Sequence, residues 1–255
     1  MKNALVFTAF AALLAVFVPA ARSADPDSRV FELRLYHAAP GKLDALQARF
    51  RDHTVRLFEK HGMTNVGYWI PAENPDNLLV YLMAYPSRDA REAMWKAFFA
   101  DPDWQAAKEA SEKDGKLVEK VDASFLALTD YSPKLVIEAR SPARQFELRT
   151  YTTNEGKLPD LDARFRDHTI ELFKRHGLAN VAYFHRMDDQ PGAANTLVYL
   201  LAHKDDAARK AGFKAFGQDP DWQAARKASE ENGPLLIKGG VNSVPMSPTD
   251  FSPLK

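Results

Sequence analysis

The chain has 255 residues, of which 45% are hydrophobic and 27% are charged, and its 34 basic side chains balance 34 acidic ones. This composition excludes a wholly disordered or collagen-like chain, and without a basic excess we expect no nucleic-acid partner. The sequence contains no cysteine, which excludes disulfides, thiolate nucleophiles, iron–sulfur clusters and cysteine zinc sites.

The first 24 residues have the pattern of a secretory signal peptide. Lys2 supplies a positive charge, Ala4–Ala20 contains no charged residue, and small residues follow up to Ala24. The alternative is an uncleaved anchor helix, since the uncharged stretch could just cross about 30 Å of hydrocarbon. The small residues and the polar Asp25–Arg29 segment favour cleavage. We therefore expect an exported protein, periplasmic or secreted, with no membrane span after cleavage.

After this segment, periodicity predicts a regular order of strands and helices. A strand is expected at Val30–His37, a helix at Lys42–His61 that Gly62 ends, and two strands at Val66–Ile70 and Leu78–Tyr85. A helix at Arg88–Ala100, another that starts at the Asp101 N-cap and ends near Gly115, and a strand at Lys120–Leu128 complete the set. The order β-α-β-β-α-β is the ferredoxin-like, split βαβ arrangement.

The same unit is then repeated. The segments FELR, ARFRDHT, HG, DPDWQAA and TDYSP recur in the second half in the same order, the last as TDFSP. A repeat of about 115 residues is too long for a solenoid, whose units run about 20–50 residues, so the sequence predicts a duplicated domain. We divide the chain into a signal peptide (1–24), a first domain (25–133), a connector (134–144) and a second domain (145–255). Because the connector contains Leu135–Ile137, we expect it to form an ordered strand.

The predicted fold class is α+β. A four-stranded sheet with helices on one face leaves its other face bare, and two such sheets can cover each other. We therefore expect two ferredoxin-like βαββαβ repeats that pair into an intramolecular pseudo-dimeric α/β barrel. Whether such chains associate further stays open.

The motifs FELR, FRDHT, KHG, DPDWQ and TDYSP, in this order, resemble the NIPSNAP family over nearly all of the chain after the signal. The resemblance implies the dimeric α/β-barrel superfamily. Members of that superfamily include cofactor-free monooxygenases, haem-degrading enzymes, haem peroxidases and small-molecule isomerases or lyases. The best-known NIPSNAP proteins are mitochondrial and look more like interaction or signalling proteins than enzymes. This chain differs from them in its secretory-type signal and its tandem copies.

The first strand of each copy contains candidate ligand-binding residues. If its alternating apolar residues pack against the helices, the residues between them point into the barrel. These residues are Glu32, Arg34 and Tyr36 in one copy and Glu147, Arg149 and Tyr151 in the other, and Tyr81 and Tyr199 are candidates for the same cavity. Arginine can bind a carboxylate or phosphate with two hydrogen bonds, and tyrosine can orient a polar ligand. The alternative is that each glutamate and arginine neutralise each other in a buried network.

His53 and His168 are the other candidates. At about 100° per residue, His53 falls at the edge of the apolar stripe of its helix. Either histidine could be a haem ligand or a general base, or a partly buried side chain hydrogen-bonded between helix and sheet. The histidines lack metal-ligand spacing, so we expect no metal site, and haem is the one cofactor left open.

The leading functional hypothesis is an exported protein that binds a small apolar or amphipathic ligand inside the barrel. Trp69 and its counterpart Phe184 are further candidates for the lining of that cavity, whereas we expect Trp104 and Trp222 to wedge a helix in place. One alternative is a cofactor-free or haem-dependent monooxygenase, by analogy of fold. The other is a protein-interaction module whose barrel is filled by side chains. Whether the protein is an enzyme stays open.

Overall fold

The structure, a computed structural model, describes residues 27–255. The predicted signal peptide therefore lies outside the described residues. Between residues 27 and 255, every helix is too short or too polar to cross a membrane.

The order of elements agrees with the sequence prediction. The first repeat contains β1 (Val30–Ala38), α1 (Leu43–Arg49), the π-helical turn η1 (Phe50–Thr54), α2 (Val55–Lys60), β2 (Thr64–Pro71), β3 (Leu78–Tyr85), α3 (Arg88–Ala100), α4 (Pro102–Ser111) and β4 (Val118–Leu128). The second contains β5 (Gln145–Thr153), α5 (Leu158–Arg164), η2 (Phe165–Thr169), α6 (Ile170–Arg175), β6 (Ala179–Arg186), β7 (Thr196–His203), α7 (Asp206–Gln218), α8 (Pro220–Ser229) and β8 (Leu236–Pro248). The predicted single helix over 42–61 is thus α1 and α2 joined by a π turn.

The repeated HG and DPDW motifs fix the start of α4. The Asp101 side chain accepts a hydrogen bond from the Asp103 backbone N–H at 2.9 Å, and Pro102 occupies the first helical position, as predicted. His61, after the end of α2, lies with its Nε2 2.7 Å from the same carboxylate. The two helices are therefore tied together by one aspartate, and His176 and Asp219 repeat this contact in the second half.

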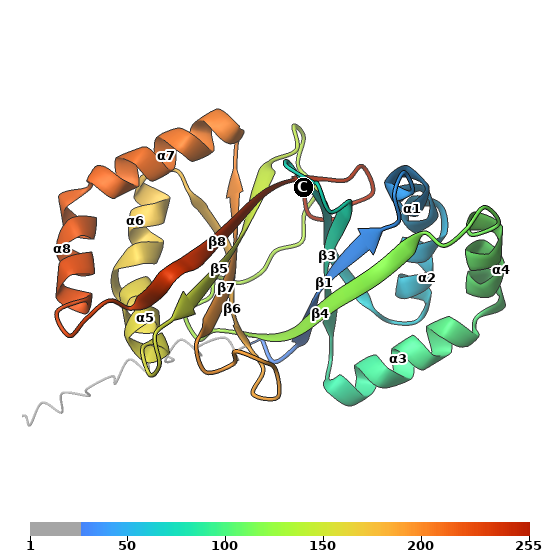
Figure 1. The fold of residues 1–255 in the computed structure, drawn as a ribbon, viewed down its shortest axis with the longest axis horizontal. Helices are drawn as coiled ribbons and strands as arrows, with labels where there is room; N and C mark the ends of the chain where they lie inside the picture. The colour runs from blue at the N-terminus through green and yellow to red at the C-terminus, as the bar shows by residue number, and fades with distance from the viewer. Residues whose placement is uncertain (1–26) are drawn as a thin grey trace, which may run out of the picture.

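The eight strands of residues 27–255 form one closed barrel in the order β1-β3-β2-β8-β5-β7-β6-β4. Strand β2 pairs with β8, and β4 pairs with β6, so both seams join the two repeats. Figure 1 shows α1–α4 and α5–α8 on opposite outer sides of the strands. The predicted intramolecular pseudo-dimeric α/β barrel is confirmed.

The TDYSP segment at the end of the first repeat binds to the second repeat. The backbone N–H of Thr129 donates to the carbonyl of Tyr183 at 3.0 Å, and the Ser132 hydroxyl accepts from the Tyr183 N–H at 3.0 Å. Asp130 forms an ion pair with Arg166 at 2.9 Å. This tail therefore continues the pairing of β4 with β6 of the other repeat.

The TDFSP segment at the end of the second repeat binds to the first repeat in the same way. Thr249 N–H donates to the carbonyl of Tyr68 at 2.9 Å, the Ser252 hydroxyl accepts from the Tyr68 N–H at 2.9 Å, and Asp250 pairs with Arg51 at 2.8 Å. The repetition of this motif is explained by a structural role, because each copy is needed to complete the opposite half.

The barrel interior is filled with apolar side chains from both repeats. Phe31 packs on Phe184 with ring centroids 5.2 Å apart, and Trp69 packs on Phe146 at 5.5 Å. Trp69 and Phe184 thus face the barrel interior, as expected, but as parts of its core. The remaining cavity among these side chains is ≈ 10 Å³, about enough for one water molecule.

The connector forms no strand, contrary to the sequence prediction. The closed barrel has no free edge with which an additional strand could pair. The connector is nevertheless held in place: Leu135 is buried in the barrel core together with Leu254, and the Lys255 N–H donates to the Glu138 carbonyl at 3.1 Å.

We expect a single repeat (residues 27–133) to dimerise with itself or to aggregate. Its edge strands β2 and β4 would be unpaired, and Tyr68 would lose its partners from the second tail. Size-exclusion chromatography with light scattering measures this, with residues 27–255 as the control. A stable monomer of one repeat would contradict the pairing described above.

Candidate functional site

The candidate residues of the first strands lie on the helix side of the sheet and not in the barrel, so the predicted orientation was wrong. Phe31 and Leu33 pack in the barrel core. Tyr36 and Tyr81 belong to the layer between the sheet and α1–α4, and the Arg34 guanidinium lies 4.6 Å from the ring centre of Trp95 in α3. The alternation was predicted correctly, but both faces of this sheet are buried, so alternation alone cannot say which face is inside the barrel.

The second repeat has the same arrangement. Arg149 Nε donates to the Tyr199 hydroxyl at 2.8 Å, and its Nη2 donates to the Tyr151 hydroxyl at 3.0 Å. The Arg149 guanidinium lies 4.7 Å from the ring centre of Phe213 in α7. Arg149, Tyr151 and Tyr199 therefore lie together, as predicted, but beneath the helices.

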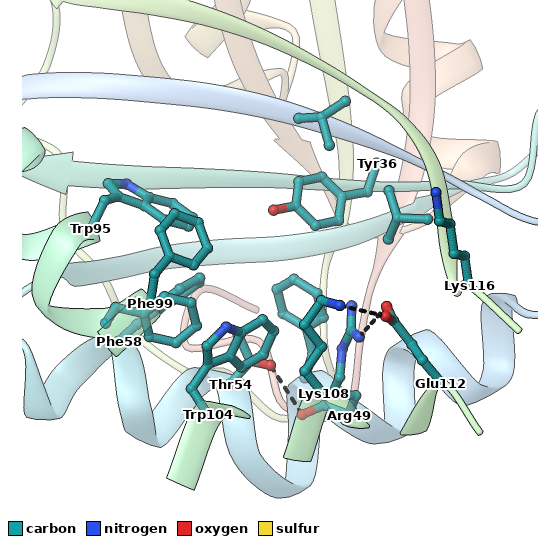
Figure 2. Close-up of a pocket in the computed structure, with 14 residues that line it drawn as sticks. Tyr36, Arg49, Thr54, Phe58, Trp95, Phe99, Trp104, Lys108, Glu112 and Lys116 are labelled. Atoms are coloured by element: carbon teal, nitrogen blue, oxygen red, sulfur yellow. Dashed lines mark hydrogen bonds and ion pairs between the residues drawn. The ribbon is translucent and has the colours of Figure 1, made fainter. Parts of the chain in front are cut away.

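The interlayer space of the first repeat contains a pocket of ≈ 270 Å³ (Figure 2). Seven aromatic side chains line it: Tyr36, Phe50, Phe58, Trp95, Phe98, Phe99 and Trp104. Four charged side chains, Arg49, Lys108, Glu112 and Lys116, also line it. In Figure 2, Trp95 and Phe99 lie at one side of the pocket and Glu112 and Lys116 at the other, so the pocket has an aromatic end and a charged end. Of the predicted ligand-binding residues, Tyr36 alone lines it.

The π turn η1 determines which side chains of the first helix reach this pocket. Thr54 donates from its hydroxyl to the Arg49 carbonyl at 3.2 Å, and both side chains are buried. A π turn inserts an extra residue, which rotates the following residues relative to a regular helix. Thr54 therefore points inward, and His53 is exposed.

The side chains of His53 and His168 are both exposed, so the sequence prediction that placed them at a ligand site or between helix and sheet was wrong. His168 borders an open surface groove together with Asp167, Glu171 and Arg175, and His53 lies outside the aromatic pocket. Neither histidine faces an enclosed apolar cavity, so the residues present do not fit a haem held by His53 or His168. Within residues 27–255, no three side chains of the types that ligate metals gather at one place.

The charged end of the pocket is held by ion pairs. Arg49 Nη1 donates to Glu112 Oε1 at 2.8 Å, Lys108 Nζ lies 2.8 Å from Oε2, and the Arg49 guanidinium lies 5.2 Å from the ring centre of Trp104. Burial alone would raise the pKa of Glu112, but the Lys108 and Arg49 cations hold it below its usual value. Glu112 is therefore ionised, with both oxygens paired. Trp104 packs on Phe98 with ring centroids 4.5 Å apart, as expected of a residue that wedges the helix, but it also lines the pocket, which the sequence did not predict.

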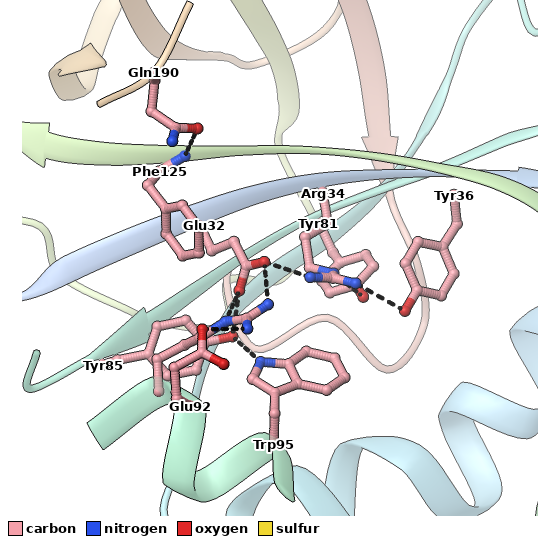
Figure 3. A network of polar contacts seen from close by, with 10 residues as sticks. Glu32, Arg34, Tyr36, Tyr81, Tyr85, Glu92, Trp95, Phe125 and Gln190 are labelled. Atoms are coloured by element: carbon pink, nitrogen blue, oxygen red, sulfur yellow. Dashed lines mark hydrogen bonds and ion pairs between the residues drawn. The ribbon is translucent and has the colours of Figure 1, made fainter. Parts of the chain in front are cut away.

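A buried polar network supports the aromatic end (Figure 3). Glu32 accepts hydrogen bonds from Arg34, from the Tyr85 hydroxyl at 2.9 Å and from Arg91 Nη2 at 2.8 Å. Trp95 Nε1 donates to the Tyr85 hydroxyl at 3.0 Å. The structure thus shows the mutual neutralisation of Glu32 and Arg34 that the sequence left as an alternative, and it ties the network to the pocket through Trp95.

The protonation states in this network favour a structural role over a role in proton transfer. Burial would raise the pKa of Glu32, but hydrogen bonds from Arg91 and the charge of Arg34 lower it. Burial raises the pKa of Tyr81 well above its ordinary value, so its hydroxyl stays neutral and accepts from Arg34 Nε at 2.8 Å.

A different set of residues surrounds Glu147 in the second repeat. His203 stands in place of Tyr85 with its Nε2 3.1 Å from Glu147, and Ser243 donates to the same carboxylate. Burial by itself would raise the pKa of Glu147. Hydrogen bonds from His203 and Ser243 outweigh burial, and together with the Arg149 guanidinium they lower the pKa to about 2.

A loop of the second repeat braces the network of the first. The Gln190 side chain accepts from the Phe125 N–H at 3.2 Å, and Asp189 pairs with Arg88 at 3.2 Å. The ring centre of Phe125 lies 3.5 Å from the Arg88 guanidinium and 5.3 Å from the Arg91 guanidinium. Figure 3 shows Gln190 and Phe125 above Glu32. Residues of the second repeat therefore contact the Glu32 network, whereas the pocket itself is lined by the first repeat.

Sequence reasoning missed most of the pocket lining because it compared the copies for identity. A useful signal lay in their differences: Trp95 and Phe99 of the first repeat correspond to Phe213 and Gly217 of the second, within otherwise similar helices. Such differences between paired copies are expected where one half has a task of its own.

The barrel, its exchanged tails and the interlayer pocket define a two-repeat α/β-barrel protein of ferredoxin-like units. The NIPSNAP family model matches residues 31–133 and 146–253, and the chain belongs to the NIPSNAP family.

Individual proteins similar to this chain are one NipSnap homologue and two solved structures. A NipSnap homologue from Dictyostelium discoideum is 24% identical over 180 residues, which cover 69% of this chain and 70% of that protein. A solved structure of an anthrone oxidase-like protein matches with a TM-score of 0.54 and 12% identity, over 90% of this chain and 95% of the other. A putative monooxygenase from Lactobacillus acidophilus matches with a TM-score of 0.53 and 9% identity, over 87% and 94%. At these identities the two structures show a shared fold alone.

We expect Glu147→Gln to flatten the acid dependence of stability. Because the pKa of Glu147 is lowered in the folded protein, its contribution is present above the unfolded value near 4.5 and is lost as pH falls toward about 2. This contribution amounts to at most about 3 kcal/mol. Urea denaturation between pH 2 and 7 measures it, with the exposed Glu155→Gln as control. Equal pH slopes for the wild type and Glu147→Gln would contradict the assignment.

Proposed function

We propose that this chain is an exported NIPSNAP protein that binds a small apolar or amphipathic molecule in the aromatic pocket of its first repeat. One observation carries the proposal: a ≈ 270 Å³ cavity lined by seven aromatic rings and open at a rim where Phe99 and Val121 are 54% and 40% exposed. Exposed apolar side chains at the mouth of a concave pocket are typical of ligand sites. Ligand pockets usually measure about 300–1,000 Å³, so the ligand is small.

The site differs from the one expected from sequence. A ligand inside the barrel is contradicted by the apolar core, which leaves ≈ 10 Å³. The space between sheet and helices is where the structure has volume, aromatic surface and charge together.

The pocket supports binding more directly than catalysis. A cofactor-free monooxygenase would need a group that accepts a proton from its substrate. The carboxylate that lines the pocket, Glu112, is paired on both oxygens, and among residues 27–255 no histidine lines the pocket. The putative monooxygenase and the anthrone oxidase-like protein share the fold at low identity. A monooxygenase activity therefore stays an alternative hypothesis. The filled barrel also suits an interaction module, which becomes the favoured function if the pocket binds nothing.

We expect the double variant Phe99→Ser/Val121→Ser to weaken binding of the neutral probe 2-naphthamide about tenfold, because apolar contact at the rim is lost. Both side chains are largely exposed, so we expect the variant to fold, and thermal denaturation checks this. Isothermal titration calorimetry measures the change. The matched control is Val136→Ser, which removes a 56% exposed apolar side chain outside the pocket. Equal affinities of the double variant and the control would refute the pocket.

Export rests on Lys2, the uncharged Ala4–Ala20 stretch and the small residues that follow it. Native mass spectrometry of the full chain, expressed in its own cell type and recovered from the export compartment, should give a mass without about the first 24 residues. Recovery of the uncleaved chain from the cytoplasm would contradict export. The same spectrum detects any retained organic ligand.

A further inference from the structure

We infer that the pocket of the first repeat takes an anionic aromatic ligand, a planar apolar body with a carboxylate or similar negative group. The inference rests on the proposed function and names its ligand class. Two observations carry it: the charge balance of the pocket lining, and the difference between the two repeats at matching positions.

The lining carries more positive than negative charge. Arg49, Lys108 and Lys116 are cationic, and Glu112 is the one anionic side chain among the lining residues, so the formal charge is +2. Glu112 engages Arg49 and Lys108, while Lys116 forms no ion pair with a residue of the described chain. A negative ligand group would complete this balance, whereas a cation would meet repulsion.

Arg49 also has one buried donor without a partner, as does its counterpart Arg164, so this feature is common to both repeats. Its Nη1 donates to Ser111 and Glu112, but its Nε is buried and has no hydrogen-bond partner within residues 27–255. A guanidinium presents five N–H donors in a planar fork and binds carboxylates through two of them. Arg49 therefore supplies a buried positive charge next to the Trp104 ring.

The other end of the pocket selects a flat apolar body. Trp95 and Phe99 pack with ring centroids 5.2 Å apart, and Phe58 lies 5.2 Å from Trp95. Aromatic rings prefer offset or edge-on neighbours at about 4.5–7 Å, so a planar ring adds favourably to such a set. In Figure 2 this aromatic end and the Lys116 end face each other across the cavity, which fits one molecule with a ring and a charge at opposite ends.

The second repeat differs from the first at three of these lining positions. Pro234 replaces Lys116, Phe213 replaces Trp95, and Gly217 replaces Phe99. The arginine–glutamate pair itself is kept, as Arg164 and Glu230 at 3.1 Å, so that pair is part of the shared fold. Five aromatic lining residues are also kept, as Tyr151, Phe165, Phe173, Phe216 and Trp222. The residues specific to the first repeat are therefore Trp95, Phe99 and the unpaired Lys116, and we infer one binding site per chain.

The test compares two probes of nearly equal shape, 2-naphthoate and 2-naphthamide, in calorimetric titrations at pH 7 against residues 27–255. We expect one 2-naphthoate per chain, bound about tenfold more tightly than 2-naphthamide. Lys116→Glu should weaken 2-naphthoate about tenfold and change 2-naphthamide less than about twofold, because it reverses a charge and removes little apolar contact. The control is Lys238→Glu, an exposed lysine of the second repeat outside the pocket, which should leave both affinities unchanged.

The outcomes separate the two proposals. If both probes bind equally and the Phe99→Ser/Val121→Ser variant weakens both, the anion inference is wrong and the pocket remains the ligand site. Equal losses of 2-naphthoate binding in Lys116→Glu and Lys238→Glu, or two bound molecules per chain, would also overturn the inference. If neither probe binds, the proposed function fails together with it.

Discussion

The closure of the barrel by strands from different repeats is the constraint on which the rest of the structure depends. Each four-stranded sheet has an apolar face that must be covered, and the pairs β2–β8 and β4–β6 bring the two faces together. The exchanged TDYSP and TDFSP tails then fasten each half to the backbone of Tyr68 or Tyr183 in the other. Because closure uses every strand edge and fills the interior, space for a ligand remains outside the barrel, beneath the helices.

That interlayer space holds the polar chemistry of the molecule. The same glutamate–arginine–tyrosine cluster occurs in both halves, and removing either member of a buried ion pair leaves an uncompensated charge, which explains why both copies keep it. Around this shared cluster the halves differ: Tyr85 and Trp95 in one correspond to His203 and Phe213 in the other. A duplicated chain can vary one half in this way, whereas a homodimer changes both sites at once.

The sequence was most informative where the local signal was strong. Strand β3 and helix α3 begin and end where predicted, and the Asp101 cap forms as expected. The helix over 42–61 was located correctly, but a constant turn of about 100° per residue misplaced His53, because the π turn at Phe50–Thr54 changes the phase. The residue pattern FRDHT does not predict that turn.

The sequence by itself determined the duplicated βαββαβ unit, the NIPSNAP family and the grouping of Arg34 with Tyr36, since these depend on periodicity, motif order and spacing along one strand. Only the tertiary structure decided which face of β1 lies inside the barrel, because both faces are buried and their alternation is the same in either orientation. It also decided where a cavity exists. The pocket is formed by side chains from β1, α1, η1, α2, α3, α4 and β4 and from the loop between α4 and β4, which come together only when the helices pack on the sheet.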